Sequence, residues 1–118
     1  MEQSDLDFNT TDLIYHVTTQ HDWITAQLSG IYNRSTKGKS FDDVGFIHAS
    51  TAIQLEETKN FIYGNSTEKL VVLVLSQSTL SSAGIEVRFE DGGEGEFYPH
   101  IFAPVSYTHL TLPTIYSV

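Results

Sequence analysis

Residues 45–51 read Gly-Phe-Ile-His-Ala-Ser-Thr, and we expect the fold to be organised around this stretch. Phe46 and Ile47 favour a strand, whereas the hydroxyl of Thr51 favours the start of a helix. A junction between strand and helix directs side chains and free backbone N–H groups towards a common point. The stretch therefore predicts a polar site at His48 and Ser50.

A similar pattern, Ile-Tyr-His-Val-Thr, occupies residues 14–18. Positions i and i+2 of a strand share one face, so His16 pairs with Thr18 as His48 pairs with Ser50. Together the two patterns predict a solvent-open pocket lined by His16, Thr18, His48, Ser50, Tyr98 and His100. The alternative is structural: buried imidazoles need hydrogen-bonding partners, and these rings could instead join strands through the backbone.

Length and composition indicate a single globular domain without duplex-binding or membrane-spanning character. The chain has 118 residues, 40% of them hydrophobic, and its 15 acidic and 6 basic residues give a net charge of −9. Such a charge repels a nucleic-acid backbone, which argues against duplex nucleic acid as a partner. No apolar run approaches the ~20 residues of a membrane span, and no signal-peptide pattern is visible. The absence of cysteine fits a cytoplasmic protein.

Three of the six basic residues fall within one segment, at Arg34, Lys37 and Lys39. We interpret residues 33–44 as a long loop, because the segment is rich in Ser, Thr, Lys, Gly and Asp. One interpretation of the basic residues is a solvated loop. The other is a grip on the phosphate of a small, nucleotide-like ligand.

Hydrophobic patterning predicts an α+β domain over residues 12–104. We expect strands at 12–18, 69–75, 85–90 and 96–104, with the continuous apolar run at 69–75 in the centre of the sheet. Pro99 is expected to interrupt the last of these strands. Two helices are predicted, one capped by Thr19 and ended by Gly30, the other capped by Thr51 and ended by Gly64. Residues 76–84 read as a polar connection.

The two ends of the chain are expected to lie outside this domain. Residues 1–11 are polar and acidic and are interpreted as a disordered leader. Residues 105–114 look like the translated read-through of a sequencing adapter, so 105–118 are interpreted as a non-native tail that truncates the natural chain. His109 and Tyr116 therefore receive no functional role. The alternative is an ordinary C-terminal strand.

Other site chemistries find less support in the spacing. Three histidines could ligate zinc, but His16, His48 and His100 lie far apart in the sequence, and no metal is expected. Ser50 lacks the Gly-x-Ser-x-Gly elbow of serine hydrolases. Acidic residues cluster ahead of His100, mostly as a solvated turn, and Glu90 is the one chosen as a carboxylate at the pocket.

These motifs, with Trp23, Gly30 and Tyr32, Val-Arg-Phe-Glu at 87–90 and Tyr-Pro-His at 98–100, resemble the small bacterial "domain of unknown function 952" family. That family is similar in fold to ADP-ribosyltransferases. The resemblance implies split antiparallel sheets with two helices packed on them, and NAD as a substrate. It further implies catalytic roles for His16, His48, Ser50 and either Glu90 or His100. The ligand-binding residues that it implies are Thr18, Tyr32, Arg34, Lys37, Thr51 and Tyr98.

In this scheme His16 and Thr18 hold a ribose, Ser50 orients the ligand, and Arg34 or the nearby lysines meet phosphate. Glu90 stabilises the developing positive charge, and we expect binding without transfer if Glu90 points away from the ligand. Two histidines paired with hydroxyls are also typical of two-histidine cyclic phosphoesterases, where one ring acts as base and the other as acid. A non-catalytic module that binds a nucleotide or metabolite is the third possibility.

Overall fold

The computed structural model describes residues 12–106 and 114–116, and within them the chain forms a mixed α+β fold of four helices and ten strands. The main sheet consists of β1 (Leu13–Thr19), β6 (Leu70–Ser76) and β10 (Thr114–Tyr116), in the order β1-β6-β10. Both neighbours are antiparallel to β6. The central place predicted for the apolar run at 69–75 is confirmed, because a strand covered on both faces can be apolar throughout.

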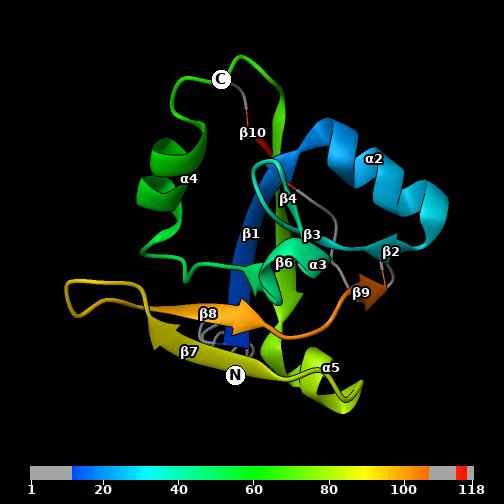
Figure 1. Ribbon diagram of the computed structural model, residues 1–118, viewed down its shortest axis with the longest axis vertical. Helices are drawn as coiled ribbons and strands as arrows, with labels where there is room; N and C mark the ends of the chain where they lie inside the picture. Colours follow the sequence, from blue (N-terminus) through cyan, green and yellow to red (C-terminus); the bar gives the residue numbers. More distant parts are fainter. Residues whose placement is uncertain (1–11, 107–113, 117–118) are drawn as a thin grey trace, which may run out of the picture.

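A second antiparallel sheet carries most of the candidate site. Its strands are β5 (Ile47–His48), β8 (Phe97–Ile101) and β7 (Val87–Asp91), in the order β5-β8-β7. In Figure 1, β7 and β8 run across the direction of the long strands β1 and β6. The two three-stranded sheets of the domain are therefore differently oriented.

The stretch at 45–51 joins these two sheets. His48 is paired with His100 in β8, and the N–H of Ala49 donates to the carbonyl of Pro99 at 3.0 Å. Two residues further on, Ser50 and Tyr15 of β1 exchange backbone hydrogen bonds of 2.7 and 2.8 Å. One short segment thus belongs to both ladders, which is why it organises the fold.

The two predicted helices are present, but the second begins at Leu55 with Gln54 as its N-cap, so the prediction that Thr51 caps it is wrong. The helix α2 (Gln20–Ser29) begins at Thr19, whose hydroxyl accepts from the Asp22 N–H, and ends at Gly30 with φ 89°. The helix α4 (Leu55–Tyr63) follows a turn in which Thr51 and Gln54 bond each other reciprocally. Figure 1 shows α4 on one side of the β1–β6 pair and α2 on the other.

Two segments predicted as loops are instead structured. Residues 33–44 form the hairpin of β3 (Arg34–Thr36) with β4 (Lys39–Ser40) and then the short helix α3 (Phe41–Val44). Residues 76–84 contain the helix α5 (Gln77–Ser82), anchored by the fully buried Leu80. The hydroxyl of Ser40 caps the start of α3, and the hydroxyl of Ser76 caps the start of α5. Helices this short give little hydrophobic periodicity, so the number of helices predicted was wrong.

The predicted interruption at Pro99 is also wrong. β8 pairs with β7 without a break, and Pro99 stands opposite Phe89. The missing N–H removes one donor only, while the Pro99 carbonyl still accepts from Ala49 on the β5 side. One lost hydrogen bond is therefore tolerated inside the sheet.

A small outer pair, β2 (Ile31–Tyr32) with β9 (Val105–Ser106), closes the domain beside α2. Val105 is buried in the core together with Tyr32, and β10 adds to the edge of β6. Residues 1–11, predicted as a disordered leader, and His109 lie outside the described residues. The non-native origin of residues 105–118 stays a prediction. No helix in the described part of the chain is long and apolar enough to span a membrane.

Candidate functional site

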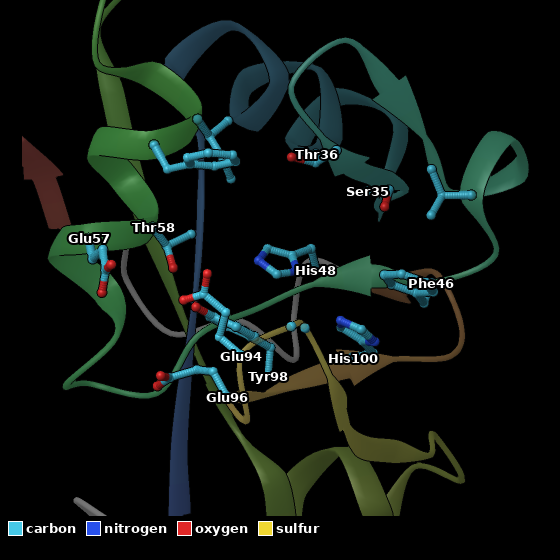
Figure 2. Close-up of a pocket in the computed structure, with 15 residues that line it drawn as sticks. Ser35, Thr36, Phe46, His48, Glu57, Thr58, Glu94, Glu96, Tyr98 and His100 are labelled. Atoms are coloured by element: carbon cyan, nitrogen blue, oxygen red, sulfur yellow. The ribbon is translucent and has the colours of Figure 1, made fainter.

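A cavity of about 650 Å³ lies between α4, the β3–β4 hairpin and the β5–β8–β7 sheet. Figure 2 shows its lining side chains, which come from segments far apart in the sequence. Aromatic rings, hydroxyls and carboxylates dominate the lining. The residues are Ser35, Thr36, Val44, Phe46, His48, Glu57, Thr58, Phe61, Ile62, Gly92, Gly93, Glu94, Glu96, Tyr98 and His100.

Three of the predicted pocket residues meet here. His48 and His100 are directly opposite each other on neighbouring strands, and their ring centroids are 5.5 Å apart. The ring of Tyr98, two residues before His100, is also 5.5 Å from the ring of His48. The period of two along β8 puts Tyr98 and His100 on the same face. The structure therefore brings these three residues together at one cavity.

The imidazole of His48 is neutral at physiological pH. Burial, and to a smaller extent the neighbouring His100, lower its pKa to about 4. Within the described residues neither ring nitrogen of His48 has a hydrogen-bonding partner. A neutral imidazole offers one donor and one acceptor, so this ring can bond a ligand in the cavity.

His100 is held from two sides. Its Nδ1 bonds Oε1 of Glu90 at 2.7 Å, and the ring of Phe46 stacks on it with centroids 3.9 Å apart and planes 13° apart. A carboxylate oxygen accepts, so Nδ1 carries the proton and Nε2 is left for other partners. Glu90 also lies 4.0 Å from a guanidinium nitrogen of Arg88. Glu90 does not line the cavity and reaches it only through His100.

His16 does not reach the cavity, contrary to prediction. Its ring is buried behind β5, where Nδ1 bonds the His48 carbonyl oxygen at 2.5 Å and Nε2 bonds the Tyr32 hydroxyl at 2.6 Å. Burial lowers the pKa of His16 to about 4. Because a carbonyl only accepts, Nδ1 donates to it, and the Tyr32 hydroxyl must then donate to Nε2.

Thr18 and Ser50 are also absent from the lining, although the same-face pairing of His16 with Thr18 is present. Thr18 and His16 both hydrogen-bond the buried Tyr32 hydroxyl, whose pKa is raised mainly by burial. Ser50 is 1% exposed and is fixed through its backbone to Tyr15. The predicted six-residue lining is therefore wrong at these three positions, because the strands bury them against one another.

The expected phosphate grip is not formed by the lining either. The Nε of Arg34 faces an Asp22 carboxylate oxygen at 3.6 Å, and the ammonium of Lys37 lies 5.6 Å from the centre of the Tyr63 ring. Thr51 bonds Gln54 at the start of α4. Each of these side chains is engaged within the domain and contributes nothing to the cavity wall.

Several lining residues were not found by sequence reasoning. Glu57, Thr58 and Phe61 lie on α4, where the helical pattern gave no sign of a functional face. Ser35 and Thr36 were assigned to a loop rather than to β3. Glu94 and Glu96 belong to the acidic turn that was considered, but Glu90 was chosen instead. The glycines of this turn were a signal in the sequence. At Gly92 a glycine is needed because a Cβ there would lie 2.5 Å from the Tyr98 ring.

One buried amide connects the two walls of the cavity. Gln54 Oε1 accepts from the Thr51 N–H at 3.1 Å, and Nε2 donates to the Phe97 carbonyl at 2.8 Å and to Oε2 of Glu96 at 3.2 Å. Gln54 thereby links the start of α4 to the β7–β8 turn. Among the described residues no group of three or more His, Cys, Asp or Glu is arranged to hold a metal ion.

Comparisons with known proteins identify a family and a shared fold. The family model described as "Protein of unknown function (DUF952)" matches residues 17–112, which extends into the stretch interpreted as a non-native tail. The crystal structure of protein CC0527 from Caulobacter crescentus is similar, with a TM-score of 0.70 at 23% identity over 90% of this chain and 87% of that one. Its solution NMR structure gives 0.69 at 24% identity, over 87% and 83%. None of the curated proteins matches this chain.

Proposed function

The chain belongs to the family described as Protein of unknown function (DUF952), and we propose that its cavity binds NAD or a related nucleotide-like ligand in an ADP-ribosyltransferase-like manner. The observation that carries this proposal is the meeting of His48, Tyr98 and His100 in one cavity of about 650 Å³. A concave site with aromatic walls and a few polar groups is the usual form of a small-molecule site.

The side chains offer both stacking and hydrogen bonding to a heterocyclic ring. Tyr98 and Phe46 supply aromatic surface, and aromatic rings attract other rings in offset or edge-to-face arrangements. The unpartnered nitrogens of His48 supply one donor and one acceptor. A base or a nicotinamide ring meets both requirements. His16 cannot hold the ribose, because it lies behind β5 and does not reach the cavity. We assign that role to no other single residue.

The position of Glu90 favours binding over transfer. Transfer from NAD breaks the bond between nicotinamide and ribose, and a carboxylate close to the ribose would stabilise the positive charge that develops. Glu90 instead accepts from His100 and stays outside the lining. We therefore expect a binding module in which Glu90 positions His100. Should transfer occur, the carboxylates near the ligand are Glu57, Glu94 and Glu96.

Isothermal titration of the full chain with NAD and ADP-ribose tests the proposal. The proposal is supported if either ligand binds and its affinity falls at least tenfold in His48→Ala. The control is His21→Ala, an exposed position on α2, where the affinity should be unchanged. Release of nicotinamide from NAD, followed by chromatography, separates transfer from binding. Equal affinity in both variants would place the ligand elsewhere, and the proposal would then be wrong.

One observation favours a second candidate, a two-histidine cyclic phosphoesterase. His48 and His100 are adjacent, and only His100 has a carboxylate partner, so the two rings differ as an acid and a base must. The lining offers no lysine or arginine to a phosphate, which weakens this candidate. Hydrolysis of a 2′,3′-cyclic nucleotide that is lost in both His48→Ala and His100→Ala would favour it over NAD binding.

A further inference from the structure

All charged side chains that line the cavity are acidic. Glu57 contributes from α4, and Glu94 and Glu96 contribute from the β7–β8 turn. Figure 2 shows these three carboxylates on the same side of the cavity, around Tyr98. Among the described lining residues there is no lysine or arginine to compensate them. The local potential therefore attracts cations and repels phosphate, in the same sense as the net charge of −9.

Arg34 and Lys37, in the hairpin that borders the cavity, do not change this balance. Arg34 is paired with Asp22 at 3.6 Å, and Lys37 lies over the Tyr63 ring. His48 is held neutral by burial, so it adds no positive charge at physiological pH. A ligand with a pyrophosphate would find no cationic partner inside the cavity.

Aromatic surface accompanies the carboxylates. Phe46, Tyr98 and Phe61 all line the cavity, and Phe61 is 89% exposed at the rim. The face of an aromatic ring attracts a cation within ~6 Å, by ~0.5–2 kcal/mol depending on desolvation. Carboxylates beside aromatic faces thus suit a flat organic cation better than a neutral or an anionic ring.

A separate feature is an unpartnered hydroxyl in the wall of the cavity. Ser35 is fully buried in β3, lines the cavity, and its hydroxyl has no hydrogen-bonding partner in the described part of the chain. Figure 2 shows this hydroxyl turned from β3 towards the other lining residues. An unpartnered buried hydroxyl costs ~1–3 kcal/mol, so an atom of the occupant is expected to complete it.

We propose that the group bound in this cavity is a planar organic cation, such as a pyridinium or a protonated heterocycle, held by Glu57, Glu94, Glu96 and the aromatic rings. This inference rests on the proposed function and names the part of the ligand that enters. Any phosphate of that ligand stays outside the cavity.

Isothermal titration of the full chain with matched rings tests the charge requirement. The probes are 1-methylnicotinamide, which is cationic, nicotinamide, which is neutral, and nicotinate, which is anionic. We expect the cation to bind at least tenfold more tightly than nicotinamide, and nicotinate to bind most weakly. The preference should shrink as salt rises from 50 to 500 mM, because the carboxylates are exposed to solvent and are screened.

Glutamine substitutions assign the preference to residues. The triple variant Glu57→Gln, Glu94→Gln, Glu96→Gln should lose most of the preference for the cation. The control is Glu56→Gln, compared with the single variant Glu57→Gln, because each removes one charge from α4 and only Glu57 lines the cavity. A preference that survives in the triple variant, or is equally lost in the control, overturns the assignment.

The outcomes separate this inference from the proposed function. Binding of 1-methylnicotinamide without binding of NAD supports a cation site and contradicts the nucleotide proposal. Equal affinity for NAD, for NADH with its uncharged reduced ring, and for ADP-ribose supports a nucleotide site and overturns the cation requirement. If none of the probes binds, both are wrong.

Discussion

The ring of His16 holds the backbone of His48: its Nδ1 donates to the His48 carbonyl oxygen at 2.5 Å. His16, in the motif at residues 14–18, thus fixes the main chain of His48, in the motif at residues 45–51, from behind the cavity wall. The Tyr32 hydroxyl fixes the other ring nitrogen of His16, and Thr18 bonds that hydroxyl in turn. A buried chain of hydrogen bonds links β1 and β2 to the strand that presents His48 to the cavity.

Replacing His16 by alanine should destabilise the domain strongly. The change removes the side-chain partner of the His48 carbonyl, leaves the Tyr32 hydroxyl with Thr18 alone, and opens a cavity in the core. Together these effects should lower the free energy of unfolding by ~3–4 kcal/mol. Urea denaturation measures the loss. The exposed His21→Ala serves as control and should change stability by less than ~0.5 kcal/mol. A loss of that small size in His16→Ala would show that the buried chain contributes little.

The two histidines with depressed pKa should make the fold sensitive to mild acid. Both rings are neutral in the folded state down to a pKa of about 4, whereas an unfolded histidine titrates near ~6.5. Between these values the unfolded state binds more protons, so the free energy of unfolding falls as pH falls from ~6.5 to ~4. The loss is on the order of 3 kcal/mol for each ring at the end of this window.

Urea midpoints at pH 7.5, 6.0 and 5.0 check this pH dependence. His48→Gln removes one of the two titrating rings and should flatten the slope between pH 6.5 and 5. Carboxylates with lowered pKa, such as Asp12 and Asp43, lose their contribution only at lower pH and do not interfere in this window. An unchanged slope in His48→Gln would contradict the assignment of the lowered pKa to its ring.

The long elements and their caps were predictable because their signals are local. The apolar run of β6 is continuous, and Thr19, Asp22 and Gly30 all lie within or directly beside one ten-residue helix. The short hairpin and helix at 34–44 were missed because polar residues there are ordered by caps such as Ser40 with Asp43. Tertiary packing, rather than composition, decides the structure of such segments.

The candidate site was only half predictable for a different reason. A strand position says which residues share a face, but not whether that face meets solvent or another sheet. His48 and His16 have nearly the same sequence context, yet one faces the cavity and the other is buried against Tyr32. The bridge between Ser50 and Tyr15 fixes which side of the wall each histidine faces. A contact between residues 35 positions apart cannot be predicted from a local sequence pattern.

Replacing Gly92 by alanine should displace the Tyr98 ring. The added Cβ would meet two ring carbons at 2.5 and 2.7 Å, closer than real contacts allow, so the ring must move. Because Tyr98 lines the cavity, we expect ligand affinity to fall about tenfold, which corresponds to ~1.4 kcal/mol. Titration of Gly92→Ala with whichever ligand binds the native chain measures this.

A double-mutant cycle identifies the cause. In a Tyr98→Ala background the clash is gone, so adding Gly92→Ala should cost little further affinity. Equal losses in both backgrounds would mean that Gly92 acts through the conformation of the turn, and the contact with Tyr98 would not be the reason for glycine at this position.

Replacing Gln54 by glutamate should separate the two walls of the cavity. The new carboxylate can still accept from the Thr51 N–H, but it cannot donate to the Phe97 carbonyl, and it repels Glu96. Losing two donated hydrogen bonds at a buried position and placing two carboxylates side by side should cost ~2–4 kcal/mol of unfolding free energy at pH 7. Lowering the pH towards 5 should recover part of this loss in the variant, because protonation removes the repulsion. Urea denaturation at both pH values tests this, with the exposed Gln27→Glu on α2 as matched control. A variant as stable as that control would show that Gln54 does not hold the β7–β8 turn against α4.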